Sequence, residues 1–265
     1  MVWNIGIVGF GRMGKAIAMG LINSGMNPST IAVYDKEAST LQHAKTLGLK
    51  ITSSNTETIL NSDIVILAVK PNDIIKVVNE VSSVAENRIV VSIAALVPYK
   101  TIKSYLPKSY VYRAMPNIAV EVNSGFIALT PHGEKDAEVE RLFRFLGDVV
   151  WVDEEVLDIL TLISASTPAL LAEIADTFIL ASLKSGVPYS IAKKVVSSLF
   201  KGVGELLNHK PLSDIRDSVI TPRGVTIKLI EKFYIHNAKS KLLETLSIAI
   251  EEYLSMLDEV RDKYK

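Results

Sequence analysis

The sequence contains no cysteine and few histidines. Among its 265 residues there is no cysteine, and the four histidines are His43, His132, His209 and His236. The absence of cysteine excludes disulfides, thiolate metal sites and a cysteine nucleophile. Each histidine lies in a polar stretch, where a surface position is expected rather than a role as metal ligand or general base. The sequence therefore predicts no metal centre.

The chain also has no excess of charge of either sign. It contains 29 Lys and Arg and 29 Asp and Glu residues, so its formal net charge is zero. This balance gives no electrostatic reason to expect nucleic acid or an anionic membrane as a partner. No contiguous apolar run approaches the ~20 residues needed to cross a bilayer, and no basic leader precedes the first predicted strand. We therefore expect a cytoplasmic protein that does not enter a membrane.

A glycine-rich motif lies close to the start of the chain. The apolar residues 5–8 predict a short buried strand, followed by Gly9-x-Gly11-x-x-Gly14 and a helix-compatible segment that ends near residue 25. In this setting Gly9 permits a tight turn, Gly11 lets backbone approach a pyrophosphate, and Gly14 lets helix and strand pack closely. The free amides and dipole of the helix N-terminus favour the phosphate charge. The motif predicts a dinucleotide-binding site, although glycines also make ordinary turns.

An acidic residue follows the second predicted strand. Residues 31–34 form an apolar run, and Asp35 lies 35 − 14 = 21 residues beyond Gly14. This is near the spacing of the carboxylate that binds the adenosine ribose of NADH and repels the 2′-phosphate of NADPH. Lys36 could offset that repulsion, so the sequence leaves the choice between NADH and NADPH open.

The two parts of the chain have different patterns. Residues 1–152 alternate short Val- and Ile-rich runs with helical segments, which predicts a Rossmann-type α/β domain with a doubly wound parallel sheet. Residues 153–265 show helical periodicity alone and predict an all-α domain. A long helix over residues 153–184 contains Pro168, which is expected to end or kink it. The mean hydropathy of +0.27 is high for a soluble chain, which suggests that apolar surface is buried between subunits.

Small and polar residues follow several predicted strands and are expected to meet at one edge of the sheet. Ligands of open α/β sheets bind outside the carboxyl ends of the strands. Ala94 and Ala95 leave room for a flat ring, and the amide of Asn117 can orient a carboxamide or a carboxylate. The predicted cofactor-binding residues are Gly9, Phe10, Gly11, Arg12, Met13, Gly14, Asp35, Lys36, Ala68, Val69, Lys70, Pro71, Ala94, Ala95, Met115, Pro116 and Asn117.

Four of these segments together resemble a known family. GFGRMGKAIAMGLINSG, AVKP, VSIAA and RAMPN, at their separations over residues 1–130, are similar to those of the pyrroline-5-carboxylate reductases. RAMPN is the most specific of them. The resemblance implies reduction of a cyclic imine acid to proline with NADPH or NADH as cofactor. It also implies that residues 153–265 form a dimerisation and substrate domain, and therefore a homodimer or a higher oligomer.

The second half departs from the family pattern at two places. The motif resembling S-G-S-G-P-A reads Ser164-Ala165-Ser166-Thr167-Pro168-Ala169, so both glycines are replaced. The loop resembling S-P-G-G-x-T reads Thr221-Pro222-Arg223-Gly224-Val225-Thr226, with Arg223 in place of the first glycine. Arg223 could add a bidentate contact to a carboxylate or could point to solvent.

The resemblance implies roles for these residues. The catalytic residues would be Thr226, hydrogen bonded to the ring nitrogen, and Asn117, lining the nicotinamide side. The substrate-binding residues would be Ser166, Pro222, Arg223, Gly224, Val225 and Thr226.

Two other functions remain open. One is a non-catalytic or altered-specificity NAD(P)-binding paralogue, which the departures at Ala165, Thr167 and Arg223 suggest. The other is a hydroxyacid dehydrogenase of the 6-phosphogluconate type, which would require a catalytic lysine such as Lys184, Lys193 or Lys194.

Overall fold

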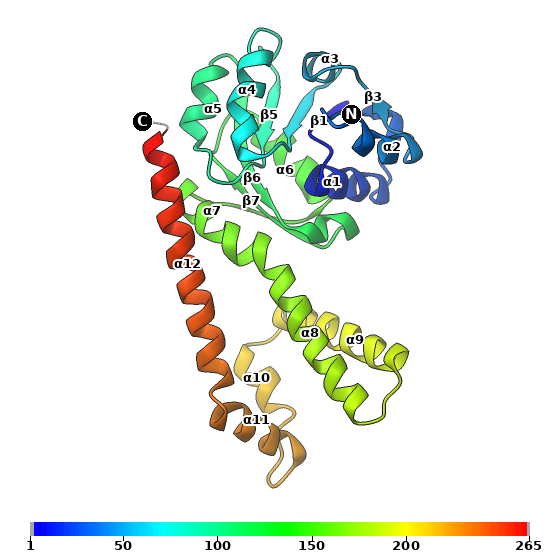
Figure 1. The fold of residues 1–265 in the computed structure, drawn as a ribbon, viewed down its shortest axis with the longest axis vertical. Coiled ribbons are helices and arrows are strands. Elements are labelled where there is room, and N and C mark those ends of the chain that lie inside the picture. Colours follow the sequence, from blue (N-terminus) through cyan, green and yellow to red (C-terminus); the bar gives the residue numbers. More distant parts are fainter. Residues whose placement is uncertain (1–2, 264–265) are drawn as a thin grey trace. The chain divides into compact units, whose positions relative to one another are not determined.

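The computed structural model describes residues 3–263, which form two compact units (Figure 1). The first unit comprises the described residues up to Ser166 together with those from Tyr253 onward, and the second is Thr167–Glu252. The last strand ends at Trp151 and the next helix begins at Glu154. The change from α/β to helical structure thus precedes the division between the compact units. The domain boundary after residue 152 stays a prediction.

The first unit is built on one eight-stranded sheet with the order β3-β2-β1-β4-β5-β6-β7-β8. The strands are β1 Ile5–Val8, β2 Ile31–Tyr34, β3 Lys50–Ile51, β4 Ile64–Leu67, β5 Ile89–Ser92, β6 Tyr110–Pro116, β7 Gly125–Thr130 and β8 Gly147–Trp151. The pairs from β3 through β6 are all parallel, which confirms the predicted Rossmann-type sheet.

Helices cover both faces of this sheet. They are α1 Arg12–Asn23, α2 Ala38–Thr46, α3 Asn55–Leu60, α4 Pro71–Val81, α5 Tyr99–Tyr105, α6 Asp136–Arg144 and α7 Glu154–Leu160, with 3₁₀ segments at Pro28–Thr30 and Ile118–Val122. Successive residues of β4 belong to different clusters: Ile64 and Ile66 pack with α1 and α6, whereas Val65 and Leu67 pack with α4 and α5. A strand buried on both faces has this near-continuous apolar sequence.

The sheet is not parallel throughout. Strand β7 pairs antiparallel with β6, and β8 is parallel to β7. The chain between β6 and β7 contains only the short 3₁₀ segment Ile118–Val122. A parallel connection needs a crossover of about a dozen residues or more, so this short connection imposes the antiparallel pairing. The predicted parallel sheet therefore carries one antiparallel pair, between β6 and β7.

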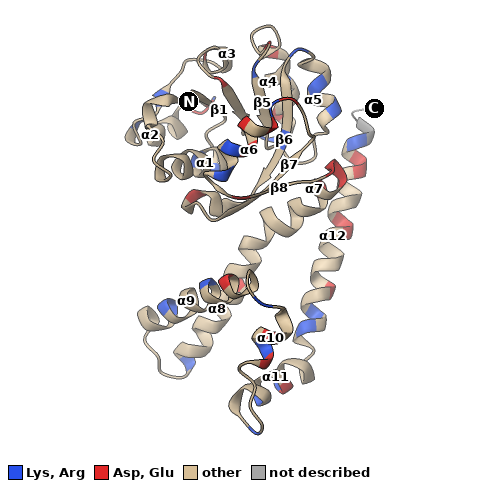
Figure 2. Cartoon of the chain, turned by 180° about the vertical axis from the view of Figure 1, so that it is seen from behind, with Lys and Arg blue, Asp and Glu red and all other residues tan. Residues whose placement is uncertain are grey.

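The second unit is entirely helical within the residues described. Its helices are α8 Thr167–Lys184, α9 Tyr189–Leu207, α10 Leu212–Asp217 and α11 Val225–Ile235, followed by the first part of α12 Ala238–Lys263. No residue of α8 or α11 is buried, and Figure 2 shows few charged residues along α8. Leu180 is 56% exposed and Leu229 is 65% exposed. The single chain therefore leaves large apolar helix faces uncovered.

Pro168 was expected to end or kink the long helix, and it does not end it. The chain is helical over Glu154–Lys184, with a π-helical segment at Thr161–Ser166. Proline removes the hydrogen bond to the residue four positions earlier and clashes with its carbonyl. Here the carbonyl concerned belongs to Ser164, inside the π-helical segment, which accommodates the missing bond.

This helix is also the one in the described chain that is long and apolar enough to cross a membrane. By length and composition alone it passes that test, with 17% of its most apolar window buried. The helix does not stand out in the sequence as one contiguous apolar run, because the charged residues Asp158 and Glu173 interrupt that run. Length and composition of one helix are weak grounds for a membrane span, since helices buried in soluble proteins pass the same test.

Candidate active site

The glycine-rich loop joins β1 to α1, and its backbone lies so close to α1 and to the end of β4 that there is little space for side chains at Gly9 and Gly14. Gly9 has φ +95°, and a Cβ there would lie 2.7 Å from the carbonyl oxygen of Ala68. A Cβ on Gly14 would collide with the carbonyl oxygen of Gly9, so α1 packs directly against the loop. Gly11 caps α1 and has no heavy atom within 4 Å of where its Cβ would be. The open space at Gly11, beside a helix N-terminus, fits a pyrophosphate.

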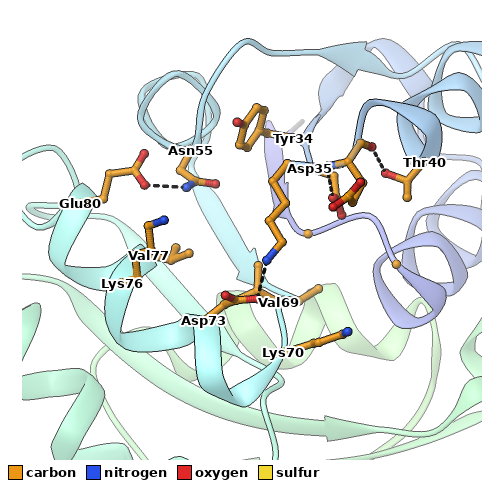
Figure 3. Close-up of a pocket in the computed structure, with 15 residues that line it drawn as sticks. Tyr34, Asp35, Thr40, Asn55, Val69, Lys70, Asp73, Lys76, Val77 and Glu80 are labelled. Carbon is orange, nitrogen blue, oxygen red and sulfur yellow. Dashed lines mark hydrogen bonds and ion pairs between the residues drawn. The ribbon is translucent and has the colours of Figure 1, made fainter.

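A pocket of about 430 Å³ lies beside this loop (Figure 3). It opens at the carboxyl ends of β1, β2 and β4 and is walled by α2 and α4. Its lining residues are Gly9, Gly11, Tyr34, Asp35, Lys36, Glu37, Thr40, Asn55, Ala68, Val69, Lys70, Asp73, Lys76, Val77 and Glu80. Seven predicted cofactor residues are among them: Gly9, Gly11, Asp35, Lys36, Ala68, Val69 and Lys70. Its place at the end of β2 is that of an adenosine ribose in this fold.

Asp35 is fixed in the pocket wall by two backbone hydrogen bonds. Its Oδ2 accepts from the N–H of Phe10 at 2.6 Å, and its Oδ1 accepts from the N–H of Glu37 at 2.8 Å. The first bond ties the end of β2 to the glycine-rich loop. A carboxylate has about four acceptor positions, so each oxygen retains capacity for a ligand hydroxyl.

Lys36 forms an ion pair with a residue of α4. Its Nζ lies 3.0 Å from Oδ2 of Asp73, and this hydrogen bond raises the pKa of Lys36 above its usual value. Asp73 lies in the first turn of α4, where the helix dipole also favours a carboxylate. The sequence pattern did not predict Asp73 as part of the site, although AVKP places it near the pocket.

The remaining predicted cofactor segments follow neighbouring strands. In the sheet register Val8 lies opposite Leu67, Leu67 opposite Ser92, and Ser92 opposite Arg113. The strand ends therefore form one continuous edge. The predicted residues that follow or end these strands and do not line the pocket are Phe10, Arg12, Met13, Gly14, Pro71, Ala94, Ala95, Met115, Pro116 and Asn117. The flat, partly apolar edge after β5 and β6 is where a nicotinamide ring would lie.

The side chain of Asn117 is already engaged at this edge. Its Oδ1 accepts from the N–H groups of Ala119 at 3.2 Å and Phe126 at 3.3 Å. Its Nδ2 donates to the hydroxyl of Ser164 at 3.3 Å. Asn117 thus caps the segment Ile118–Val122 and joins the end of β6 to the π-helical segment, which fixes the position of both.

A buried ionic network under the same edge was missed from sequence. Arg113 is 1% exposed, and its Nη1 lies 2.6 Å from Glu154 Oε1 and its Nη2 3.0 Å from Asp158 Oδ1. Oδ2 of Asp158 binds Arg261 of α12 at 3.0 Å. Glu154 also accepts from the N–H of Tyr99 at 2.6 Å. The partners of Arg113 are 41 and 45 residues away in sequence, so no local pattern could reveal them.

The predicted substrate loop belongs to the second unit. Thr221 begins a turn closed by the hydrogen bond from the N–H of Gly224 to its carbonyl at 3.0 Å. Gly224 then caps α11, whose first turn contains Val225, 86% exposed, and Thr226. Arg223 has φ +64°, a left-handed conformation that costs an L-residue about 1–2 kcal/mol. The family's glycine would adopt it without strain.

The other candidate side chains of the helical domain are at the surface. Ser166 ends the π-helical segment and is exposed. Lys184, Lys193 and Lys194 are exposed as well, unlike a buried catalytic base. Within the described residues no group of three or more His, Cys, Asp or Glu side chains could hold a metal ion.

Comparison with known proteins covers nearly the whole chain. A family model described as NADP oxidoreductase coenzyme F420-dependent matches residues 4–96, and one described as pyrroline-5-carboxylate reductase dimerisation matches residues 154–256. The pyrroline-5-carboxylate reductase of Escherichia coli K12 is 32% identical over 263 residues, covering 94% of this chain and 96% of that protein.

Two further relatives agree with this. The pyrroline-5-carboxylate reductase of Corynebacterium melassecola is 30% identical over 240 residues, covering 86% of this chain and 89% of that protein. A solved pyrroline-5-carboxylate reductase from Coxiella burnetii superposes with a TM-score of 0.84 at 28% identity, covering 96% of this chain and 98% of that one. Both halves of the chain therefore match one kind of protein in the same order.

Proposed function

The chain belongs to the pyrroline-5-carboxylate reductase family, and from this premise we propose that it reduces the cyclic imine acid pyrroline-5-carboxylate to L-proline. The observation that carries the proposal is the 32% identity with the Escherichia coli enzyme over 94% of this chain, which includes both domains. Reduction of the imine requires a hydride donor, and the bound nicotinamide of NADPH or NADH supplies it. The cytoplasm is the compartment we propose for this reaction.

The residues of the first unit hold the cofactor in this proposal. The first-turn amides of α1 and the loop from Gly9 to Gly14 bind the pyrophosphate, and Asp35 binds the adenosine ribose. The edge after β5 and β6, with Ala94, Ala95 and Met115, receives the nicotinamide ring. The collision of a Gly14 Cβ with the loop and the open space at Gly11 both fit this cradle.

Asn117 acts as a positioning residue in this proposal. Three hydrogen bonds tie its side chain to Ala119, Phe126 and Ser164, which leaves one N–H of its amide for a ligand. It holds the segment after β6 and the π-helical segment in one arrangement, which fixes the edge proposed to receive the nicotinamide ring. Correct positioning alone can lower a barrier by several kcal/mol.

The loop before α11 binds the substrate in this proposal. Helix α11 has eleven residues, and the amides of its first turn can hold a carboxylate beside Gly224 and Val225. The hydroxyl of Thr226 hydrogen bonds to the ring nitrogen. Pro222 restricts the loop, and Ser166 is expected to line the same site. A protonated imine is already electrophilic, so this arrangement needs no strong general base.

Arg223 is proposed to bind the substrate carboxylate. Its left-handed backbone conformation is strained, and strain of this kind clusters at functional sites. Its guanidinium can form two parallel hydrogen bonds with a carboxylate. Arginine keeps the backbone N–H that a glycine would offer at this position, so the guanidinium contact would add to it.

The protein is a homodimer formed through its helical domain. The matched dimerisation model covers residues 154–256, and the exposed apolar residues of α8, α9 and α11 lie within it. They include Phe178, Leu180, Ile191, Val195 and Leu229, each at least 46% exposed in the single chain. Apolar surface of this extent is buried in obligate dimers. Light scattering is expected to give twice the mass of the chain.

The direct test is an assay with the cyclic imine acid and either dinucleotide. Proline formation with consumption of NAD(P)H supports the proposal. Thr226→Ala is expected to lower turnover by about 10- to 100-fold, because a hydrogen bond to the charged imine group is lost, with dinucleotide binding unchanged. Binding of the dinucleotide by the unmodified protein without turnover would instead identify a non-catalytic paralogue. Unchanged kinetics in the variant would remove Thr226 from the site.

A further inference from the structure

We infer that the pocket beside the glycine-rich loop selects NADH and rejects NADPH. The inference rests on the proposed function and names the cofactor that this site takes. NADH and NADPH differ only at the adenosine ribose, where NADPH carries a 2′-phosphate. The discrimination must therefore come from the residues around the end of β2, which are Asp35, Lys36 and the facing first turns of α4.

Asp35 cannot turn away to admit a phosphate. Both of its carboxylate oxygens are held by backbone N–H groups, Oδ2 by Phe10 at 2.6 Å and Oδ1 by Glu37 at 2.8 Å. Rotation of the side chain would break both bonds and leave two backbone donors unsatisfied beside the pocket. A carboxylate held in this way accepts a hydrogen bond from a 2′-hydroxyl, whereas a phosphate at the same place meets a fixed like charge.

Lys36 is not free to neutralise the phosphate. Its Nζ is paired with Asp73, in the first turn of α4, at 3.0 Å. Moving Lys36 onto a 2′-phosphate would leave the carboxylate of Asp73 unpaired in the same pocket. The pair is part-exposed, with 68% of the Lys36 side chain and 34% of the Asp73 side chain accessible, so breaking it has a modest cost. The larger obstacle to NADPH is the carboxylate of Asp73, which would then be unpaired and would repel the 2′-phosphate.

The rest of the lining also disfavours a phosphate. It contains four carboxylates, Asp35, Glu37, Asp73 and Glu80, against the three lysines at 36, 70 and 76. None of the described lining residues is an arginine, the side chain that commonly receives the 2′-phosphate of NADPH. Glu80 additionally accepts a hydrogen bond from Asn55 at 2.9 Å, which holds it in the wall of the pocket.

The test measures dissociation constants of NADH and NADPH for the full-length protein by calorimetry, without substrate. ADP-ribose and its 2′-phosphate serve as probes that lack the nicotinamide. We expect NADH to bind at least 10-fold more tightly than NADPH, and ADP-ribose to show the same preference, because loss of a hydrogen bond to a charged group costs about a factor of ten or more. Equal binding, or tighter binding of NADPH, would overturn the inference.

Three variants locate the effect. Asp35→Ser is expected to weaken NADH about 10-fold and to remove or reverse the preference, and Asp35→Asn should do the same while keeping more of the local hydrogen bonding. Asp73→Asn frees Lys36 and should raise the affinity for NADPH relative to that for NADH. Glu86→Gln, at an exposed pair with Lys108 outside the pocket, is the matched control for a change of one charge and should leave the ratio unchanged.

The outcomes separate this inference from the proposed function. Reduction of the imine acid by a protein that prefers NADPH would overturn the inference and leave the function standing. A preference for NADH without reduction of the imine acid would support the inference and reject the function. Failure of both dinucleotides to bind would reject both. An unchanged ratio in both Asp35 variants would overturn the assignment to Asp35.

Discussion

Replacement of Arg113 by methionine should destabilise the first unit far more than the loss of an exposed ion pair. Arg113 is 1% exposed and bonded to Glu154 and to Asp158, itself 2% exposed. Its removal breaks two charge-assisted hydrogen bonds, each worth about 1.5–3 kcal/mol. Asp158 keeps Arg261, and Glu154 keeps the N–H of Tyr99, so neither carboxylate is left without a partner. We therefore expect a loss near the lower end of the range for a broken buried pair, about 3 kcal/mol.

The measurement is urea unfolding followed by tryptophan fluorescence. Both tryptophans, Trp3 and Trp151, belong to the first unit, so the signal reports the part of the protein that contains Arg113. The concentration of chain must be constant between variants, because dimerisation contributes to the measured stability. Lys108→Met is the matched control. Its pair with Glu86 has exposed fractions of 68% and 47%, so its loss should cost much less than the loss of Arg113.

A double variant tests the physical explanation. In Arg113→Met with Asp158→Leu, the buried arginine and the buried carboxylate are both replaced by apolar groups. Replacing a whole buried ion pair by apolar residues is often neutral, so the double variant should be more stable than Arg113→Met alone, by about 1–2 kcal/mol. Arg261 is one-third exposed and can turn to solvent. A loss in Arg113→Met no greater than in Lys108→Met, or additive losses in the double variant, would refute the explanation.

Three further predictions concern the glycine loop, the substrate loop and a buried tyrosine. Gly14→Ala should lower the free energy of unfolding by about 1–3 kcal/mol, because the added Cβ would collide with backbone atoms. Gly11→Ala has open space for its Cβ and should keep the unfolding midpoint. It should weaken dinucleotide binding at least ~10-fold, measured by calorimetry. Arg223→Gly should relieve up to about 1 kcal/mol of backbone strain and raise KM for the imine acid. The control Asn237→Gly, also at positive φ, should leave KM unchanged. An unchanged KM in Arg223→Gly would exclude a substrate contact. Burial raises the pKa of the Tyr112 hydroxyl above its usual 10.0. The stability that the neutral Tyr112 contributes is therefore complete below pH 10 and is lost as the pH rises above that value. Unfolding midpoints measured between about pH 8 and 12 should fall less steeply in Tyr112→Phe, and equal slopes would contradict this.

The sequence predicted the cofactor side of the site because its signals are local. The glycine spacing between β1 and α1 and the position of Asp35 after β2 depend on one βαβ unit, and the structure has that unit with aligned strand ends. The bonds from Asp35 to Phe10 and Glu37 lie within the same unit. Short-range spacing therefore predicts that these residues lie together, which the structure has, although it does not show how the carboxylate is held.

The features that sequence patterns missed depend on distant partners. An apolar strand has the same composition whether it pairs parallel or antiparallel, so only the short connection after β6 determines the direction of β7. Arg113 lies in RAMPN, yet its burial depends on Glu154, Asp158 and Arg261, which come from two other helices. No periodicity in the sequence links these positions. The residues of α4 that line the pocket beside the glycine-rich loop were missed for the same reason.

The departures from the family motif in the helical domain coincide with the π-helical segment. Pro168 leaves the carbonyl of Ser164 without its usual N–H donor, and the π-helical turn at Thr161–Ser166 absorbs this defect. The hydroxyl of Ser164 meanwhile accepts from Asn117, which ends β6. The π-helical turn thus accommodates Ala165 where the family motif has a glycine. The hydrogen bond from Asn117 to Ser164 joins this turn to the edge of the sheet. The π-helical segment is therefore joined to the end of the sheet edge through the side chain of Asn117 and not through a shared backbone segment.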